Sequence, residues 1–324
     1  MLKTSITEQF GLKYPIMSSP MAMHSGGLLA GATTQAGGLG LFGAINPGGG
    51  PQWLAEQIRL ARDMCGEKPF GVGFITQMIP VFPDMFELAL EENVPVITFS
   101  FDDPAQWLER ARANGATTIC QVQSVEGAAQ AVAAGTDLLV VQGNEAGGHT
   151  GVANLMPLLL RILKDYPDTP ILAAGGIASG HSLAAVLAAG AAGAWIGTAL
   201  MATPECDQVP DEFKQLLLKA RSEDTVFTRV FDILDEAAYG IPPWPVPIGA
   251  RVITNKTTDE LHGKEDLLQA NLQQHLPAYQ QALAEGDLTR KGIFAGESVD
   301  FVNEIRPVAQ VLETICSEAE QALK

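Results

Sequence analysis

Short apolar runs recur through the first 200 residues, and glycine or proline bounds most of them. There are eight, at residues 14–20, 38–44, 70–76, 94–100, 116–122, 137–143, 170–176 and 193–200. Runs of this length fit buried β-strands. The stretches between them, such as QWLAEQIRLARDM and NLMPLLLRILKDY, repeat apolar residues three and four positions apart, which predicts amphipathic helices. The chain therefore alternates strand and helix.

This alternation predicts an α/β fold, a closed (β/α)8 TIM barrel. Strand–helix–strand units have right-handed crossovers and give parallel sheets, and eight repeats close a barrel. The competing architecture is an open doubly wound sheet, whose GxGxxG fingerprint would follow the first strand. Residues 20–27 read PMAMHSGG instead. Because barrels place functional groups at the C-terminal ends of their strands, we expect the site on that rim.

The pattern changes after residue 222, which divides the chain into a barrel and an extension. We assign residues 1–222 to the barrel, completed by about 289–324, and residues 223–288 to a helical extension. Helix is predicted from about Thr258 to Glu285 and again from Val299 to Leu323. The segment IPPWPVPIG carries Trp244 in a connection too apolar for a solvated loop, so we expect the extension to cover the active site.

The composition predicts a globular protein with an acidic surface. Of the 324 residues, 47% are hydrophobic and 18% are charged, and the formal net charge is −17. Such a field repels anions, so we expect neither nucleic acid nor a membrane as a partner. The sequence predicts no secretion signal and no membrane span. The four cysteines match no metal or CxxC spacing, and reduced thiols favour a cytoplasmic location.

Two glycine-containing segments, LAAGGIASG and WIGTALMAT, follow the seventh and eighth predicted strands. Their backbone N–H groups can converge on a phosphate, and barrels most often bind phosphate at this pair of strands. We therefore predict a phosphate site that includes Gly175, Gly176 and Gly197. The alternative is that these glycines only permit tight strand-to-helix turns.

One histidine lies in the segment GNEAGGHTG, at residues 143–151. His149 follows the sixth strand and should lie over the same rim, and a loop with four glycines offers little packing to an imidazole. We expect catalysis or ligand contact from His149, with a structural histidine as the alternative. We expect Glu145 to orient the imidazole rather than to face water.

The other histidines have weaker contexts. His24 follows the first strand and could reach the rim or pack in the core, and His181 could cap a helix. His262 and His275 are expected on the surface of the extension. No HxH, HExxH or carboxylate cluster predicts a metal.

Two glutamines alternate along the fifth strand. Gln121 and Gln123 should point to the same side, either into the barrel or outward against the helices. An inward glutamine near the strand end could serve a planar heterocycle as an amide partner or simply fill a polar layer of the barrel.

The runs QGNEAGGHTG, PILAAGGIASG and WIGTAL together resemble the nitronate monooxygenase family, formerly called 2-nitropropane dioxygenases. YPIMSSPMA, TRVFD, GARVITN and GDLTRKGIFAGES are also similar to family segments. The resemblance implies an FMN-binding barrel with a helical second domain, in which His149 faces the flavin as the catalytic residue. The cofactor-binding residues it implies are Pro20, Met21 and Ala22 along the isoalloxazine ring, Gln121, Gly147 and Gly148 beside it, and Gly175, Gly176, Gly197 and Thr198 at the phosphate. Many relatives carry an asparagine in the third strand, where this chain has Gly73.

The resemblance implies oxidation of alkyl nitronates or nitroalkanes with O2, with His149 as base or substrate-positioning group. A neutral nitroalkane must lose the proton beside its nitro group, and histidine is a suitable base near neutral pH. The same scaffold also serves FMN-dependent enoyl-acyl carrier protein reductases and quinone reductases, so an NAD(P)H-dependent reductase is the alternative. A barrel that binds flavin or another phosphorylated ligand without turnover is the non-enzyme alternative.

Overall fold

In a computed structural model, which describes residues 2–46 and 48–324, eight parallel strands form one barrel. The strands are β1 (Ile16–Ser18), β2 (Gly40–Gly43), β3 (Phe70–Ile75), β4 (Val96–Ser100), β5 (Thr117–Val122), β6 (Leu138–Gln142), β8 (Ile171–Ala174) and β9 (Gly193–Ile196). Each falls within one of the eight predicted apolar runs. The prediction of a (β/α)8 barrel is confirmed.

The ring of strands closes between β1 and the start of β2. The strand order is β1-β9-β8-β6-β5-β4-β3-β2, and Met17 forms a parallel bridge with Leu39. Ser18 N donates to Leu39 O at 3.1 Å, and Leu39 N donates to Ile16 O at 3.0 Å. Because the strands are parallel and the ring is closed, all their C-terminal ends lie on one rim.

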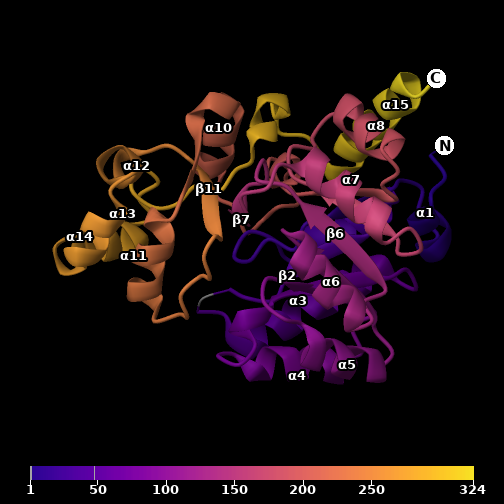
Figure 1. The fold of residues 1–324 in the computed structure, drawn as a ribbon, viewed down its shortest axis with the longest axis horizontal. Helices are drawn as coiled ribbons and strands as arrows, with labels where there is room; N and C mark the ends of the chain where they lie inside the picture. The colour runs from indigo at the N-terminus through magenta and orange to yellow at the C-terminus, as the bar shows by residue number, and fades with distance from the viewer. Residues whose placement is uncertain (1, 47) are drawn as a thin grey trace.

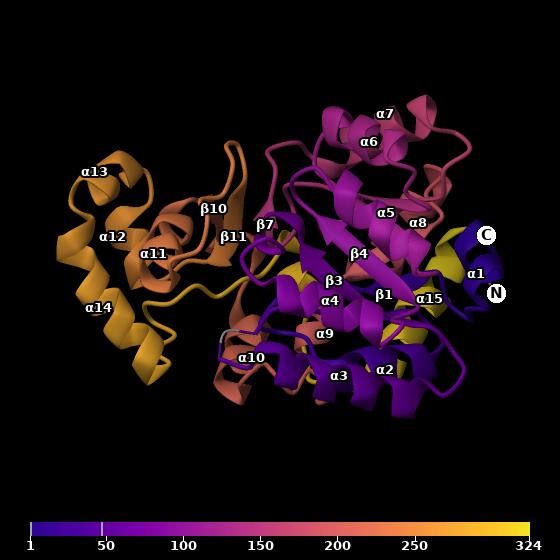
Figure 2. The same cartoon turned by 90° about the horizontal axis from the view of Figure 1, so that it is seen from below.

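Helices surround the barrel on its outer face (Figure 1). They are α2 (Gly27–Ala36), α3 (Gly50–Cys65), α4 (Pro83–Glu91), α5 (Ala105–Ala113), α6 (Val125–Ala133), α7 (Leu155–Asp165) and α8 (Gly180–Ala188). The C-terminal helix α15 (Val308–Ala322) contacts both α8 and α2 and fills the place between them. Short α1 (Ser5–Phe10) lies beside both termini (Figure 2).

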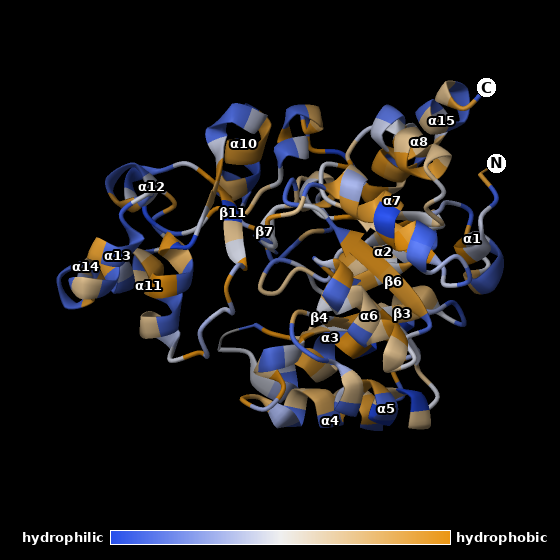
Figure 3. Cartoon of the chain, in the orientation of Figure 1, coloured by the Kyte–Doolittle hydropathy of each residue, from blue (hydrophilic) through white to orange (hydrophobic). Residues whose placement is uncertain are grey.

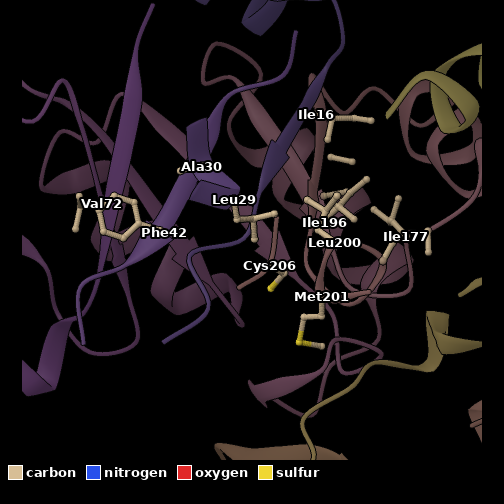
Figure 4. Packing of buried hydrophobic residues seen from close by; sticks show 14 of the residues in the cluster. Ile16, Leu29, Ala30, Phe42, Val72, Ile177, Ile196, Leu200, Met201 and Cys206 are labelled. Carbon is tan, nitrogen blue, oxygen red and sulfur yellow. The ribbon is translucent and has the colours of Figure 1, made fainter. Parts of the chain in front are cut away.

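Both faces of the barrel strands are buried, which explains why the strands read as continuous apolar runs. In β6, Leu138 and Val140 belong to the cluster inside the barrel, while Leu139 and Val141 belong to the layer under the helices. Figure 3 shows β6 as largely hydrophobic, and the helices around it carry hydrophilic positions as well. Figure 4 draws part of the outer layer, which includes Ile196.

The extension contains strands as well as helices. In the described residues, β10 (Thr225–Thr228), β11 (Gly249–Ile253) and β7 (Gly148–Thr150) form an antiparallel sheet in the order β10-β11-β7. Its helices, which gather at the end of the molecule away from the termini (Figure 1), are α11 (Val230–Tyr239), α12 (Lys256–Leu261), α13 (Glu265–Ala270) and α14 (Leu272–Glu285). The single helix predicted from Thr258 to Glu285 is therefore wrong, since turns divide that stretch into three helices.

The remaining elements are short and connect these parts. They are α9 (Thr198–Met201), α10 (Asp211–Lys219) and the 3-10 turns η1 (Thr76–Met78), η2 (Ser222–Asp224) and η3 (Glu297–Phe301). The helix predicted from Val299 to Leu323 begins only at Val308, because Pro307 precedes it and the chain turns before that point. Among the described residues, no helix combines the length and apolar character that crossing a membrane requires.

Candidate active site

A cavity of about 620 Å³ opens at the C-terminal rim of the barrel. Every residue predicted for the site lines it. These are His149, Pro20, Met21, Ala22, Gln121, Gly147, Gly148, Gly175, Gly176, Gly197 and Thr198. They come from the ends of β1, β5, β6, β8 and β9, so the closed barrel brings together motifs that are far apart in the sequence.

The segment after β1 lies directly on the strand ends because two strands carry glycine there. A β-carbon at Gly73 would overlap the Pro20 ring, and one at Gly43 would lie 2.8 Å from the backbone of Ala22. An asparagine side chain at position 73 would therefore not fit, because Pro20 occupies the space that it needs. His24 Nδ1 lies 2.9 Å from the carbonyl oxygen of Ala22, which fixes the segment from the other side.

His24 is a half-buried residue that packs at the edge of the cavity. Its ring lies 5.4 Å from that of Phe213 and 5.8 Å from that of Phe294. Burial lowers the pKa of His24, which keeps the imidazole neutral, and the carbonyl oxygen of Ala22 then accepts from Nδ1–H. His24 therefore lies at the rim, where it lines the cavity, and its ring also packs against the aromatic side chains of Phe213 and Phe294.

The glycines after β8 and β9 form a shallow backbone cradle. Gly175 and Gly176 have φ of +98° and +71°, a conformation that favours glycine. A β-carbon at Gly175 would lie 3.0 Å from Gly143 O, and one at Gly197 would lie 3.3 Å from the sulfur of Met21. The loop after β8 thus lies close to the loop after β6, and the loop after β9 lies close to the segment after β1, so a side chain at Gly175 or Gly197 would be crowded.

His149 lies on β7 and has well-defined packing. Its imidazole stacks on Trp244, with ring centroids 3.6 Å apart and planes 14° apart. Phe101 and Phe294 lie at the edges, with ring centroids at 6.4 and 6.0 Å. The glycine loop was expected to offer little packing to the imidazole, and the stacking partner comes instead from the extension, at Trp244.

Asp232 on α11 holds His149 through a hydrogen bond. Asp232 Oδ1 lies 2.9 Å from His149 Nε2, and the carboxylate is only 3% exposed. Because an ionised carboxylate can only accept, Nε2 carries the proton and Nδ1 keeps its lone pair. Arg229 Nε lies 3.9 Å from the other oxygen of Asp232. The pair is therefore a carboxylate–imidazole dyad with one free basic nitrogen.

Glu145 does not orient the histidine, which corrects the sequence-based expectation. Its carboxylate oxygens lie 3.0 and 3.1 Å from the backbone N–H of Leu155, at the start of α7. A carboxylate at a helix N-terminus satisfies an otherwise free N–H group. Glu145 thus holds its own loop to the barrel, and Asp232 contacts the imidazole instead.

Polar side chains fix the loop that carries His149. Gln142 donates to His149 O at 3.1 Å and accepts from Gln123 Nε2 at 2.9 Å. The guanidinium of Arg251, on β11, donates to Asn144 through Nε and Nη2 at 2.8 and 2.6 Å. Gln121 instead lines the cavity. Gln123 therefore supports the loop that carries His149, whereas Gln121 lines the cavity at the same rim.

Helix α11 presents a second carboxyl group to the cavity. Asp235 lies one helical turn after Asp232, and the Tyr279 hydroxyl donates to its Oδ1 at 2.6 Å. Burial raises the pKa of Asp235 to about 6, against the opposing effects of the Tyr279 hydrogen bond and His149. Sequence reasoning missed both aspartates, although two carboxylates three residues apart in the apolar run VFDILDEAAY were a usable signal.

The remaining histidines and the cysteines lie outside the cavity lining. His181 follows the N-cap Ser179 and is exposed, so it is not the cap of α8. His262 is exposed and pairs with Glu265 at 3.5 Å, and His275 is half-buried. The cysteines are buried free thiols, at Cys65, Cys120, Cys206 and Cys316. In the part of the chain that the structure describes, no group of three or more His, Cys, Asp or Glu could hold a metal ion.

A closed barrel with a glycine-lined rim cavity and an imidazole–carboxylate pair at that cavity is typical of (β/α)8-barrel enzymes. The chain belongs to the nitronate monooxygenase family, because the model of that family, described as nitronate monooxygenase, matches residues 78–318.

Relatives within this family differ in their named activities. The chain is 34% identical over 233 residues to the (3aS,4S,5R,7aS)-5-hydroxy-7a-methyl-1-oxo-octahydro-1H-indene-4-carboxyl-CoA dehydrogenase of Mycobacterium tuberculosis. That match covers 71% of this chain but only 64% of the relative's length. FabK from Thermotoga maritima superposes with a TM-score of 0.84 at 31% identity and covers 100% of this chain and 98% of its own. A nitroalkane oxidase from Streptomyces ansochromogenes superposes with a TM-score of 0.79 at 26% identity and covers 99% of this chain and 100% of its own.

Proposed function

We propose that this protein binds FMN in the rim cavity and oxidises alkyl nitronates, and the nitroalkanes from which they form, with O2. The observation that carries the proposal is that His149, which lines the glycine-lined cavity, is paired with the buried carboxylate of Asp232. The pair supplies a base for proton removal from carbon, and the family membership supports flavin chemistry. The similarity to a nitroalkane oxidase is consistent with this substrate class.

The residues at the rim fit FMN. Pro20, Met21 and Ala22 would lie along the isoalloxazine ring, with Gln121, Gly147 and Gly148 at its edges, and the phosphate would contact Gly175, Gly176, Gly197 and Thr198. Gly175 and Gly176 have left-handed backbone with φ of +98° and +71°, and two successive residues without side chains at the cavity support a ligand held by backbone N–H groups. Trp195 also lines the cavity, and among the described residues its buried Nε1 has no hydrogen-bond partner. An orphaned donor of this kind suits a ligand with acceptor atoms.

When bound, FMN would supply the redox chemistry, with O2 as the final electron acceptor. The chain's own residues would manage the proton. His149 Nδ1 would take the proton from the carbon beside the nitro group, leaving the electron pair on the nitronate. The imidazolium formed would lie beside Asp232, whose carboxylate stabilises the positive charge. Trp244 stacks on the imidazole of His149, which would hold the plane of that ring and shield one of its faces from water.

The extension would complete the pocket. Asp235, Tyr239, Ile241 and Trp244 all line the cavity from the extension side, opposite the barrel rim. We propose that residues 223–288 form a substrate-shaping unit over the barrel of residues 1–222 and about 289–324. The buried free thiols also support a reducing compartment such as the cytoplasm.

The second candidate is an NAD(P)H-dependent quinone or enoyl reductase on the same FMN barrel. The structural similarity to FabK over the full chain favours it. One experiment separates the candidates. Purified yellow protein is mixed, with and without O2, with a nitroalkane, its nitronate, NADH and NADPH. Bleaching by the nitro compounds and O2 consumption support the proposal, whereas bleaching by NADH or NADPH alone supports the reductase.

A further inference from the structure

The charged side chains that line the cavity are all acidic. Among the described lining residues there is no lysine or arginine, and the carboxylates are Asp84 and Asp235. Asp84 is exposed in the first turn of α4, while Asp235 lies deeper, on the α11 wall. A negative group that lies beside Asp235, rather than in the backbone cradle proposed for the FMN phosphate, meets no lining side-chain cation, so the charge of Asp235 disfavours anions there.

Asp235 is held in place by a hydrogen bond and lines the same cavity as His149. The Tyr279 hydroxyl occupies one carboxylate oxygen at 2.6 Å, and Tyr239 lines the cavity one turn further along α11. His149 and Asp232 are the other charged or titratable groups that influence it, and only His149 can become positive. Asp235 therefore cannot be neutralised by a permanent cation.

The total charge in the cavity differs between a neutral nitroalkane and a preformed nitronate as the entering substrate. A neutral nitroalkane with a neutral His149 has the same total charge as a nitronate with protonated His149, so proton transfer inside the cavity adds no net charge. A preformed nitronate that enters beside neutral His149 adds one negative charge to a cavity wall that already carries Asp235, whereas Asp232 is not part of the lining and has Arg229 Nε 3.9 Å from its Oδ2. Like charges at close range in a poorly solvated site are strongly unfavourable.

We propose that Asp235 is a specificity-determining residue that makes the cavity select neutral nitroalkanes over preformed nitronates and over substrates with an anionic tail. This rests on the proposed function and refines its substrate class. The nitronate that reacts is the one that His149 generates within the site. Pyrophosphate-bearing substrates would have to keep their phosphates outside the cavity.

The test compares Asp235→Asn with the control Glu236→Gln. Both variants remove one carboxylate from α11, but Glu236 is not a lining residue, and the amide oxygen introduced by Asp235→Asn can still accept from the Tyr279 hydroxyl. The kcat/KM is measured on FMN-loaded enzyme for nitropropane, its preformed nitronate and nitropropanoate. We expect Asp235→Asn to raise kcat/KM for both anions about tenfold relative to nitropropane. Glu236→Gln should leave the ratios unchanged.

The inference would be overturned if the ratio of kcat/KM for each anion to kcat/KM for nitropropane were equal in the wild type and both variants, or changed equally in both variants. Either result would leave the proposed function standing. If no variant oxidises any nitro compound, the proposed function fails, and the charge selection is tested by binding alone. Propanoate and propanamide are then titrated against the flavin absorption spectrum. Tighter propanoate binding by about tenfold in Asp235→Asn supports the inference, and unchanged affinity overturns it.

Discussion

Asp232 and His149 come from different parts of the fold and meet in one hydrogen bond of 2.9 Å. His149 belongs to the loop after a barrel strand, and Asp232 belongs to the first turn of α11 in the extension. The extension thus sets the tautomer of a side chain that the barrel carries. If the proposed function is correct, changes in the extension should alter proton transfer as well as substrate fit.

Asp232→Asn should lower kcat/KM for nitroalkanes by roughly 10²-fold or more. The asparagine amide can donate to Nε2, which moves the imidazole proton to Nδ1 and removes the proposed base. Activity on preformed nitronate should fall much less, because the proton is already gone. Steady-state kinetics on both substrates measure the split, with surface Asp266→Asn as the charge control. Equal loss on both substrates would mean that Asp232 serves only to hold the fold.

His149→Ala should abolish activity on neutral nitroalkanes and retain much of the wild-type rate on preformed nitronates. General base catalysis is worth about 10²- to 10⁴-fold, so the selective loss should be readily measurable. His181→Ala, on the exposed start of α8, is the control. Parallel loss on both substrates would instead assign His149 to steadying the anion or the flavin. Wild-type kinetics on both would remove it from the mechanism.

Gly176→Asp should sharply reduce FMN affinity while the apo-protein still folds. The substitution adds a negative charge where the phosphate is expected, and its β-carbon would contact Glu145 Cβ at 3.4 Å. Gly286→Asp is a matched control, since Gly286 has φ of +70° against +71° for Gly176 and open space around it. Flavin content and apo-protein melting measure the two effects. Unchanged flavin content in Gly176→Asp would place the phosphate elsewhere.

Trp244→Ala should change KM and substrate preference more than FMN affinity. Its ring stacks on His149 at 3.6 Å and meets Phe101 edge-on at 4.9 Å, so its loss widens the cavity and frees the imidazole. Removing this buried side chain should also cost about 3 kcal/mol of folding stability. Kinetics below the melting range separate the effects. Lower stability with unaltered kinetics would mean that Trp244 only packs the extension on the barrel.

Asp235→Asn should stabilise the protein above about pH 6 and have less effect near pH 4. Burial raises the pKa of Asp235 in the folded state to about 6, so the folded protein binds this proton more tightly than the unfolded chain. Wild-type stability is therefore lost as pH rises through that range, and the neutral amide avoids the loss. Thermal melting should give a Tm about 2 °C higher at pH 7.5. An equal Tm difference at both pH values would contradict the assignment.

Local sequence patterns predicted the barrel because strands buried on both faces, such as Leu138–Gln142, leave a continuous apolar run. They also located the glycine loops at the rim. They could not predict β7, since three residues in a glycine-rich segment carry no periodic signal. Nor could they pair Asp232 with His149, because the two are 83 positions apart and meet only through tertiary packing.

The contact between Pro20 and Gly73 restricts the order in which this protein could evolve. An asparagine at position 73, as many relatives carry, would collide with the Pro20 ring if it arose first. Exchange of Pro20 for glycine would remove the colliding atoms of residue 20, and Thr98 Oγ1, which would lie 2.8 Å from the same β-carbon, would also have to move. A lineage that acquired the asparagine would therefore also change at positions 20 and 98, and the three positions should be inherited together.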